Sequence, residues 1–128
     1  MDSVVHFEIP ADNPKRASEF YNKAFGWSTN DMPEMNYITL GTTESDENGT
    51  PKEPGMINGG MAKRGGAVEH IVVTISVPDI DAALSRIEKL GGKTVTKKTS
   101  IGGDMGFIGY FKDTEGNVVG LWQSAHPM

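Results

Sequence analysis

The chain of 128 residues contains no cysteine, which excludes disulfides, thiolate metal sites and a cysteine nucleophile. No apolar run approaches the roughly 18 residues of a membrane-spanning helix. Basic residues are also few, because 12 Lys and Arg face 17 Asp and Glu for a net charge of −5. A nucleic-acid groove needs clustered Lys and Arg, so we expect no nucleic-acid partner and no membrane partner.

The first ten residues, MDSVVHFEIP, lack the basic region and the long apolar stretch of a secretion signal. We therefore expect a cytoplasmic protein. The length is sufficient for a single domain, 1–128, that buries a hydrophobic core.

Two segments of the chain repeat one pattern 66 residues apart: FEIPADNPKRASEFYNKAFG at 7–26 and VTISVPDIDAALSRIEKLGG at 73–92. Phe7 and Ile9 fall on Val73 and Ile75, and Gly26 falls on Gly92. An internal duplication of this kind predicts two related half-modules, 1–61 and 70–128, joined by a linker at 62–69.

The first half-module reads as a strand, a helix and further strands. Residues 4–9 alternate in polarity, which predicts a strand with Phe7 and Ile9 on one face and His6 and Glu8 on the other. Asn13-Pro14 predicts the start of a helix, and Gly26 predicts its end. The helix carries an apolar stripe that we expect to be buried: Ala17, Phe20, Tyr21, Ala24 and Phe25. Short strands at Trp27, 35–40 and 56–61 should follow, with a polar hairpin connection at 41–55.

The second half-module follows the same order. A strand at 70–77 precedes Asp79, which predicts a helix cap. The helix should bury Ile80, Ala83, Leu84, Ile87 and Leu90 and stop at Gly91-Gly92. Strands are predicted at 93–97, 106–112 and 117–123. Each half is therefore one strand, one helix and three strands.

This order resembles the vicinal oxygen chelate superfamily, which includes glyoxalase I, extradiol dioxygenases, fosfomycin-resistance transferases and bleomycin-binding proteins. The resemblance rests on HFEIPADNPKRASEFYNKAFGW at 6–27, VPDIDAALSRIEKLGG at 77–92 and YFKDTEGNVVGLWQ at 110–123. It implies an α+β fold in which two βαβββ modules form a cupped, mostly antiparallel eight-stranded sheet with both helices outside. It also implies a homodimer and a small-molecule ligand.

The resemblance further implies four metal-ligand positions, and here they read His6, Gly59, Val72 and Gly120. Only His6 has a donor atom, whereas a catalytic divalent ion needs two or three protein ligands and an open position. We therefore expect no metal cofactor. An alternative is a displaced set, His6, Glu8 and His70, which would suit Ni(II), Zn(II) or Fe(II).

Strand alternation predicts a ligand pocket on the inner face of the sheet, lined by His6, Glu8, Val72, Thr74, Gly120 and Trp122. Gly120 would leave room beside the Trp122 indole, while His6 and Glu8 would supply polar anchors. The alternatives are a structural histidine at His6, a salt bridge of Glu8 at a dimer contact, and simple core packing of Trp122.

Three functions fit these residues. The preferred one is a glyoxalase/bleomycin-resistance-like protein that binds a small organic molecule without a metal. The second is a metal-dependent lyase, similar to lactoylglutathione lyase, or a dioxygenase with relocated ligands. The third is a metal-free enzyme that uses Glu8 and His6 for acid–base catalysis on a carbonyl substrate. Whether the protein is an enzyme, and which ligand it takes, stays open at this point.

Overall fold

The computed structural model describes residues 1–126. These form two compact units, an N-terminal unit of residues 6–71 and a C-terminal unit of residues 1–5 together with the chain from residue 72 onward. The units differ from the predicted half-modules because the first five residues cluster with the second half. The backbone N–H of Ser76 donates to the carbonyl of Ser3 at 2.9 Å, which ties the start of the chain to the C-terminal unit.

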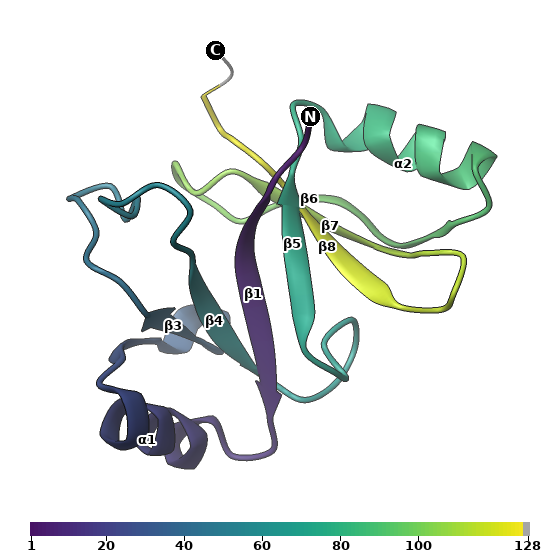
Figure 1. The fold of residues 1–128 in the computed structure, drawn as a ribbon. Coiled ribbons are helices and arrows are strands. Elements are labelled where there is room, and N and C mark those ends of the chain that lie inside the picture. Colours follow the sequence, from purple (N-terminus) through teal and green to yellow (C-terminus); the bar gives the residue numbers. More distant parts are fainter. Residues whose placement is uncertain (127–128) are drawn as a thin grey trace. The chain divides into compact units, whose positions relative to one another are not determined.

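The N-terminal unit contains a four-stranded sheet and one α-helix (Figure 1). Its elements are β1 (Val4–Ala11), α1 (Pro14–Phe25), β2 (Ser28–Met32), the short 3-10 helix η1 (Pro33–Met35), β3 (Tyr37–Gly41) and β4 (Asn58–Lys63). The strands lie in the order β2-β3-β4-β1. β1 runs parallel to β4, whereas the other neighbours are antiparallel. β4 includes Ala62 and Lys63, so the linker between the halves runs over residues 64–71, two residues later than the predicted 62–69.

The ends of α1 are those that its sequence predicts. The side chain of Asn13 accepts a hydrogen bond from the Arg16 N–H at 3.1 Å, and Pro14 occupies the first turn, where no N–H is needed. Gly26 ends the helix in the left-handed region at φ 77°.

The prediction of a fully buried stripe on α1 is wrong. Ala17 and Tyr21 pack on the core of the unit, which consists of Ala11, Ile38, Leu40 and Met61. However, Phe20 is 60% exposed and Phe25 is 65% exposed, while Ser18 is buried. The face of α1 that packs on the sheet carries Ser18 and Tyr21, so Phe20 lies at the side of the helix. Phe25 is the last residue of the helix. Both exposed rings pack against Tyr21 instead, at 5.2 and 6.2 Å between centroids.

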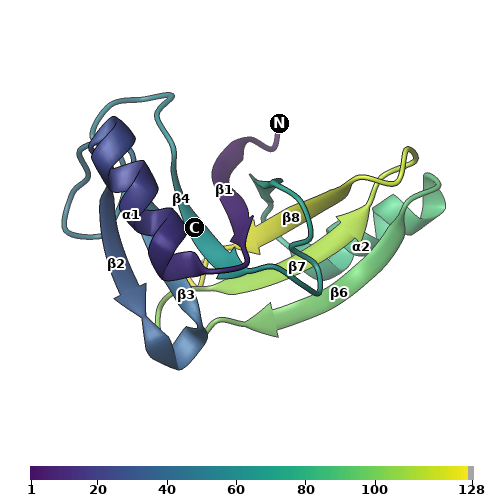
Figure 2. The ribbon, with the colours of Figure 1, turned by 90° about the horizontal axis from the view of Figure 1, so that it is seen from below.

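The C-terminal unit repeats this plan, and Figure 2 shows β6, β7 and β8 side by side. Its elements are β5 (Val72–Ser76), α2 (Ile80–Lys89), β6 (Lys93–Ser100), β7 (Phe107–Lys112) and β8 (Val118–Gln123). The strand order is β5-β8-β7-β6, with β5 parallel to β8 and the other pairs antiparallel.

Helix α2 is buried more completely than α1. Its side chains Ile80, Ala83 and Leu84 form a core with Val77 and Leu121. Asp79 caps the helix by accepting from the Ala82 N–H at 3.2 Å. The expected burial of Leu90 is wrong, because this residue is 74% exposed at the C-cap, beyond the last turn. Val73, the counterpart of Phe7 in the duplication, is 43% exposed.

The α+β class and the two βαβββ modules are confirmed, since each unit holds one strand, one helix and three further strands in chain order. Among residues 1–126, no helix is long and apolar enough to cross a membrane.

Candidate functional site

A polar group lies on the face of the N-terminal sheet that is opposite α1. Alternation along β1 places Phe7 and Ile9 toward the helix-side core. It therefore places His6 and Glu8 on the other face. The parallel register of β1 and β4 sets His6 beside Asn58 and Glu8 beside Gly60.

His6 forms a hydrogen bond with a residue that the sequence analysis did not single out. Its Nε2 lies 2.9 Å from the hydroxyl oxygen of Tyr37, on β3. Burial lowers the pKa of His6 from its ordinary value, and the nearby charge of Glu8 opposes that shift only in part. The imidazole is therefore neutral at pH 7, with one nitrogen able to donate and the other able to accept.

Glu8 is a charged residue in a buried position, because only 7% of it is exposed. Its charge acts on His6, so the two side chains form one electrostatic group. A buried carboxylate next to a neutral imidazole is an arrangement that can bind a polar ligand or move a proton.

Gly60 makes the contact between His6 and Tyr37 possible. A Cβ at Gly60 would overlap the hydroxyl and ring atoms of Tyr37. The phenol therefore lies across β4 in space that only a glycine leaves open, and from there it reaches β1. The sequence offers a weak signal for this, the pair Gly59-Gly60 within a short strand. It offers none for the choice of Tyr37.

The assignment of Gly59 to a family ligand position is wrong by one residue. Gly59 lies beside Phe7 on the helix side, where a Cβ would overlap the Phe7 ring. In the C-terminal unit Thr74 lies beside Gly120. Thr74 is the counterpart of Glu8 in the duplication, and Glu8 lies beside Gly60. Gly60 is therefore the counterpart of Gly120.

In the C-terminal unit the structure places four predicted site residues on the sheet face opposite α2: Val72, Thr74, Gly120 and Trp122. The expected free space at Gly120 is largely filled. A Cβ there would lie 2.8 Å from Thr74 Oγ1 and 3.4 Å from a ring carbon of Tyr110. Tyr110 faces Gly120 across β7 and β8, and sequence reasoning missed it.

Trp122 is held at its polar edge. Its Nε1–H donates to the carbonyl of Met105 at 2.9 Å, in the loop between β6 and β7. Gly106 permits this contact, because a Cβ at that position would lie 3.0 Å from the indole nitrogen and would overlap the Gln123 carbonyl. The indole is therefore anchored to the loop by a hydrogen bond.

The residues at the family's metal positions do not fit a divalent ion. With the corrected register these positions read His6, Gly60, Val72 and Gly120, and three of them have no donor atom. Nor do His, Cys, Asp or Glu side chains gather in a group of three or more that could hold a metal ion anywhere in residues 1–126. His70 is exposed in the loop between β4 and β5, so the structure does not bring it together with His6 and Glu8 as a ligand set.

Comparison with known proteins agrees with this fold. The family model of the Glyoxalase/Bleomycin resistance protein/Dioxygenase superfamily matches residues 3–121. The chain belongs to this superfamily. It is 32% identical over 117 residues to a glyoxylase-like domain-containing protein of Didymella fabae, covering 86% of this chain and 84% of that protein.

Solved structures share the fold at lower identity. A methylmalonyl-CoA epimerase in complex with methylmalonyl-CoA and NH4+ has a TM-score of 0.68 at 17% identity, with 98% of this chain and 96% of that chain covered. Methylmalonyl-CoA epimerase from Mycobacterium tuberculosis has a TM-score of 0.64 at 17% identity, with 96% and 88% covered. At these identities the likeness concerns the fold, and function has to be argued from the site.

Proposed function

We propose that this protein binds a small organic molecule and needs no divalent metal ion to do so. The observation that carries the proposal is the group formed by His6, Tyr37 and Glu8. A neutral imidazole hydrogen-bonded to a phenol, beside a buried carboxylate, presents donors and acceptors for a ligand with carbonyl, carboxyl or hydroxyl groups. The metal positions support it as well, since glycine and valine supply no ligands there.

The proposed ligand-binding residues are those of the sequence analysis with Tyr37 added. They are His6, Glu8 and Tyr37 in the N-terminal unit, and Val72, Thr74, Gly120 and Trp122 in the C-terminal unit. We also propose that the protein is a homodimer, because the exposed ring of Phe20 gives α1 an apolar surface that association would cover.

Calorimetry on EDTA-treated protein tests the binding proposal. Thermal-shift screening of carbonyl- and carboxylate-bearing compounds, with methylmalonyl-CoA among them, would select the ligand. Glu8→Gln and Trp122→Phe should each weaken binding by about tenfold, whereas Glu19→Gln on the exposed face of α1 should leave it unchanged. Binding that leaves both site variants unaffected would place the site elsewhere.

Metal titration of the EDTA-treated protein tests the proposal that no divalent ion is needed. Titration with Ni(II), Zn(II) and Fe(II) should show no tight stoichiometric site. A submicromolar site that is lost in His6→Ala, or ligand binding that appears only after metal addition, would contradict the proposal and favour the metal-dependent lyase or dioxygenase.

Metal-free acid–base catalysis by Glu8 and His6 is a second candidate. It is favoured by the burial of Glu8 and by the lowered pKa of His6, which keeps a neutral base beside a carboxylate. Methylmalonyl-CoA, the ligand of one structural neighbour, has an acidic C–H next to a carbonyl. After EDTA treatment, enzyme in D2O should exchange that proton, and Glu8→Gln should slow exchange by about a hundredfold or more. Binding of methylmalonyl-CoA without proton exchange would contradict the catalytic candidate and keep the binding proposal.

A further inference from the structure

The hairpin between β3 and β4 is extended relative to its counterpart between β7 and β8. Both turns use the same device, in which an Asp side chain accepts two backbone N–H groups. Asp46 accepts from Asn48 and Thr50, and Asp113 accepts from Glu115 and Asn117. In the C-terminal unit the strands begin directly beside that turn, whereas in the N-terminal unit residues 42–57 separate β3 from β4.

The base of this extension is held by the side-chain amide of Asn58. Its Oδ1 accepts from the backbone N–H groups of Thr42 and Thr43 at 2.9 and 3.2 Å, and its Nδ2 donates to Ser45 Oγ at 2.7 Å. Thr42 Oγ1 also donates to the Ile57 carbonyl at 2.5 Å. These bonds fix the start of the extension. It follows Gly41, which pairs with Ser28 at the start of β2, just after α1.

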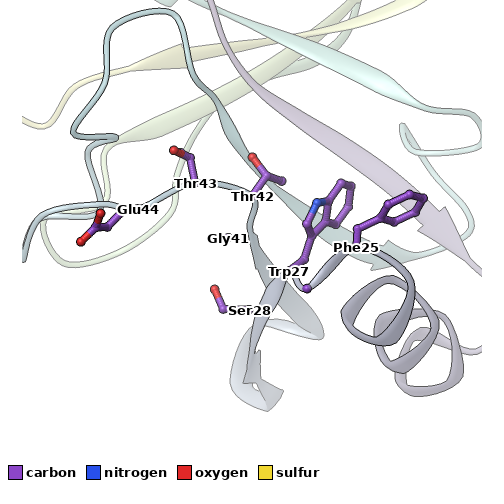
Figure 3. Close-up of a pocket in the computed structure, with 8 residues that line it drawn as sticks. Phe25, Trp27, Ser28, Gly41, Thr42, Thr43 and Glu44 are labelled. Atoms are coloured by element: carbon purple, nitrogen blue, oxygen red, sulfur yellow. The ribbon is translucent and has the colours of Figure 1, made fainter.

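A hollow of about 330 Å³ lies between these segments, within the N-terminal unit. It is lined by Phe25, Gly26, Trp27, Ser28, Gly41, Thr42, Thr43 and Glu44. Figure 3 shows Gly41 in the middle of these residues, with Trp27 and Phe25 on one side and Glu44 on the other. One end of the hollow is thus aromatic and the other end is acidic.

At the aromatic end the Trp27 indole packs against Phe7, Tyr21 and Phe25, while the Phe25 ring is open to a ligand. Phe25 is 65% exposed. Tyr21 stacks on Trp27 at 5.0 Å and 8°, which orients the indole. Within residues 1–126 the Trp27 Nε1–H makes no hydrogen bond, and Figure 3 shows this nitrogen on the side of the ring toward Thr42.

The acidic end carries the charge of the lining. Glu44 is the one ionisable side chain among the lining residues, and it is 83% exposed. Lys52 approaches one of its carboxylate oxygens at 3.5 Å from a position that is itself 55% exposed. A pair this exposed is weak, so Lys52 competes for the carboxylate without closing it off.

We propose that this hollow binds small organic cations with an aromatic body, that is, arylalkylammonium ions. The aryl group would lie against Phe25 and Trp27, and the ammonium group would point toward Glu44. The site shares no residue with the group formed by His6, Tyr37 and Glu8, so it stands or falls independently of the proposed function.

The test follows the indole N–H resonance of Trp27 in ¹⁵N-labelled protein, assigned by its absence in Trp27→Phe. 2-Phenylethylammonium should shift this resonance with millimolar affinity and leave the Trp122 resonance in place. The neutral 2-phenylethanol and the anionic 3-phenylpropanoate should bind about two- to fivefold more weakly or not at all, because they lack the cation that the ring faces and Glu44 attract.

Variants at the acidic end should act in opposite directions. Glu44→Gln should weaken the cation by about two- to fivefold, and Lys52→Gln should strengthen it, because it removes the competing ammonium group. Glu53→Gln, exposed on the same extension but outside the lining, is the matched control and should change nothing. An unmoved Trp27 resonance, equal affinity for all three probes, or equal effects of the three variants would overturn the proposal.

Discussion

The imidazole of His6 and the phenol of Tyr37 are joined by a hydrogen bond of 2.9 Å across 31 residues of sequence. Their strands are not neighbours, because β4 lies between β1 and β3 in the sheet of the N-terminal unit. The phenol therefore crosses β4, and it does so where Gly60 has no side chain. One glycine on β4 thus allows a polar group to form between side chains of β1 and β3.

Removing the Tyr37 hydroxyl should destabilise the protein. In Tyr37→Phe the half-buried imidazole loses its partner, which should lower the free energy of unfolding by about 1 kcal/mol. Urea denaturation followed by circular dichroism measures this. Tyr21→Phe is the matched control, because the Tyr21 hydroxyl makes no hydrogen bond with the residues that the structure describes. Equal losses in both variants would show that the His6 contact contributes nothing.

Adding a methyl group at Gly60 should cost more than removing the hydroxyl. Gly60→Ala places a Cβ in the space of the Tyr37 ring, and overpacking of this kind costs about 1–3 kcal/mol of unfolding free energy. In a Tyr37→Ala background the space is empty, so the same substitution should be much less costly. A double-mutant cycle measures the difference. Additive effects in the cycle would contradict the proposed role of Gly60.

Stability should depend on pH through His6. The pKa of His6 in the folded protein lies below its ordinary value of 6.5, so the unfolded chain takes up the proton first as the pH falls. The free energy of unfolding should therefore be constant above about pH 7 and should fall below about 6.5, until the folded state is protonated as well. His6→Gln should lose this component below about pH 6.5. Parallel stability curves for the two proteins would rule out a lowered pKa.

The exposed surface of α1 should support association. We expect light scattering to report a homodimer at micromolar concentration and Phe20→Ser to raise the dimer dissociation constant by about tenfold or more, because a buried aromatic anchor is lost. Val95→Ser, on β6 and 42% exposed, is the control for loss of an exposed apolar side chain. A monomeric wild-type protein would remove this prediction.

Much of the architecture could be predicted from local patterns. Asn13 and Asp79 cap their helices by bonding N–H groups three residues away, and Gly26 adopts a left-handed conformation that side chains disfavour. Alternation along β1 correctly separated Phe7 and Ile9 from His6 and Glu8. These features depend on interactions between residues that are close in the chain, so the local sequence is enough to predict them.

The candidate site depended on tertiary structure. Periodicity showed that Phe20 and Phe25 belong to an apolar stripe of α1, but only the packing of Ser18 and Tyr21 decided which part of the helix is covered. The choice of Gly60 over Gly59 required the register of β1 on β4, and the partner of His6 required the position of β3. Register and burial are set by groups that are distant in sequence and adjacent in space, so the sequence determined the elements and the tertiary structure determined which side chains meet.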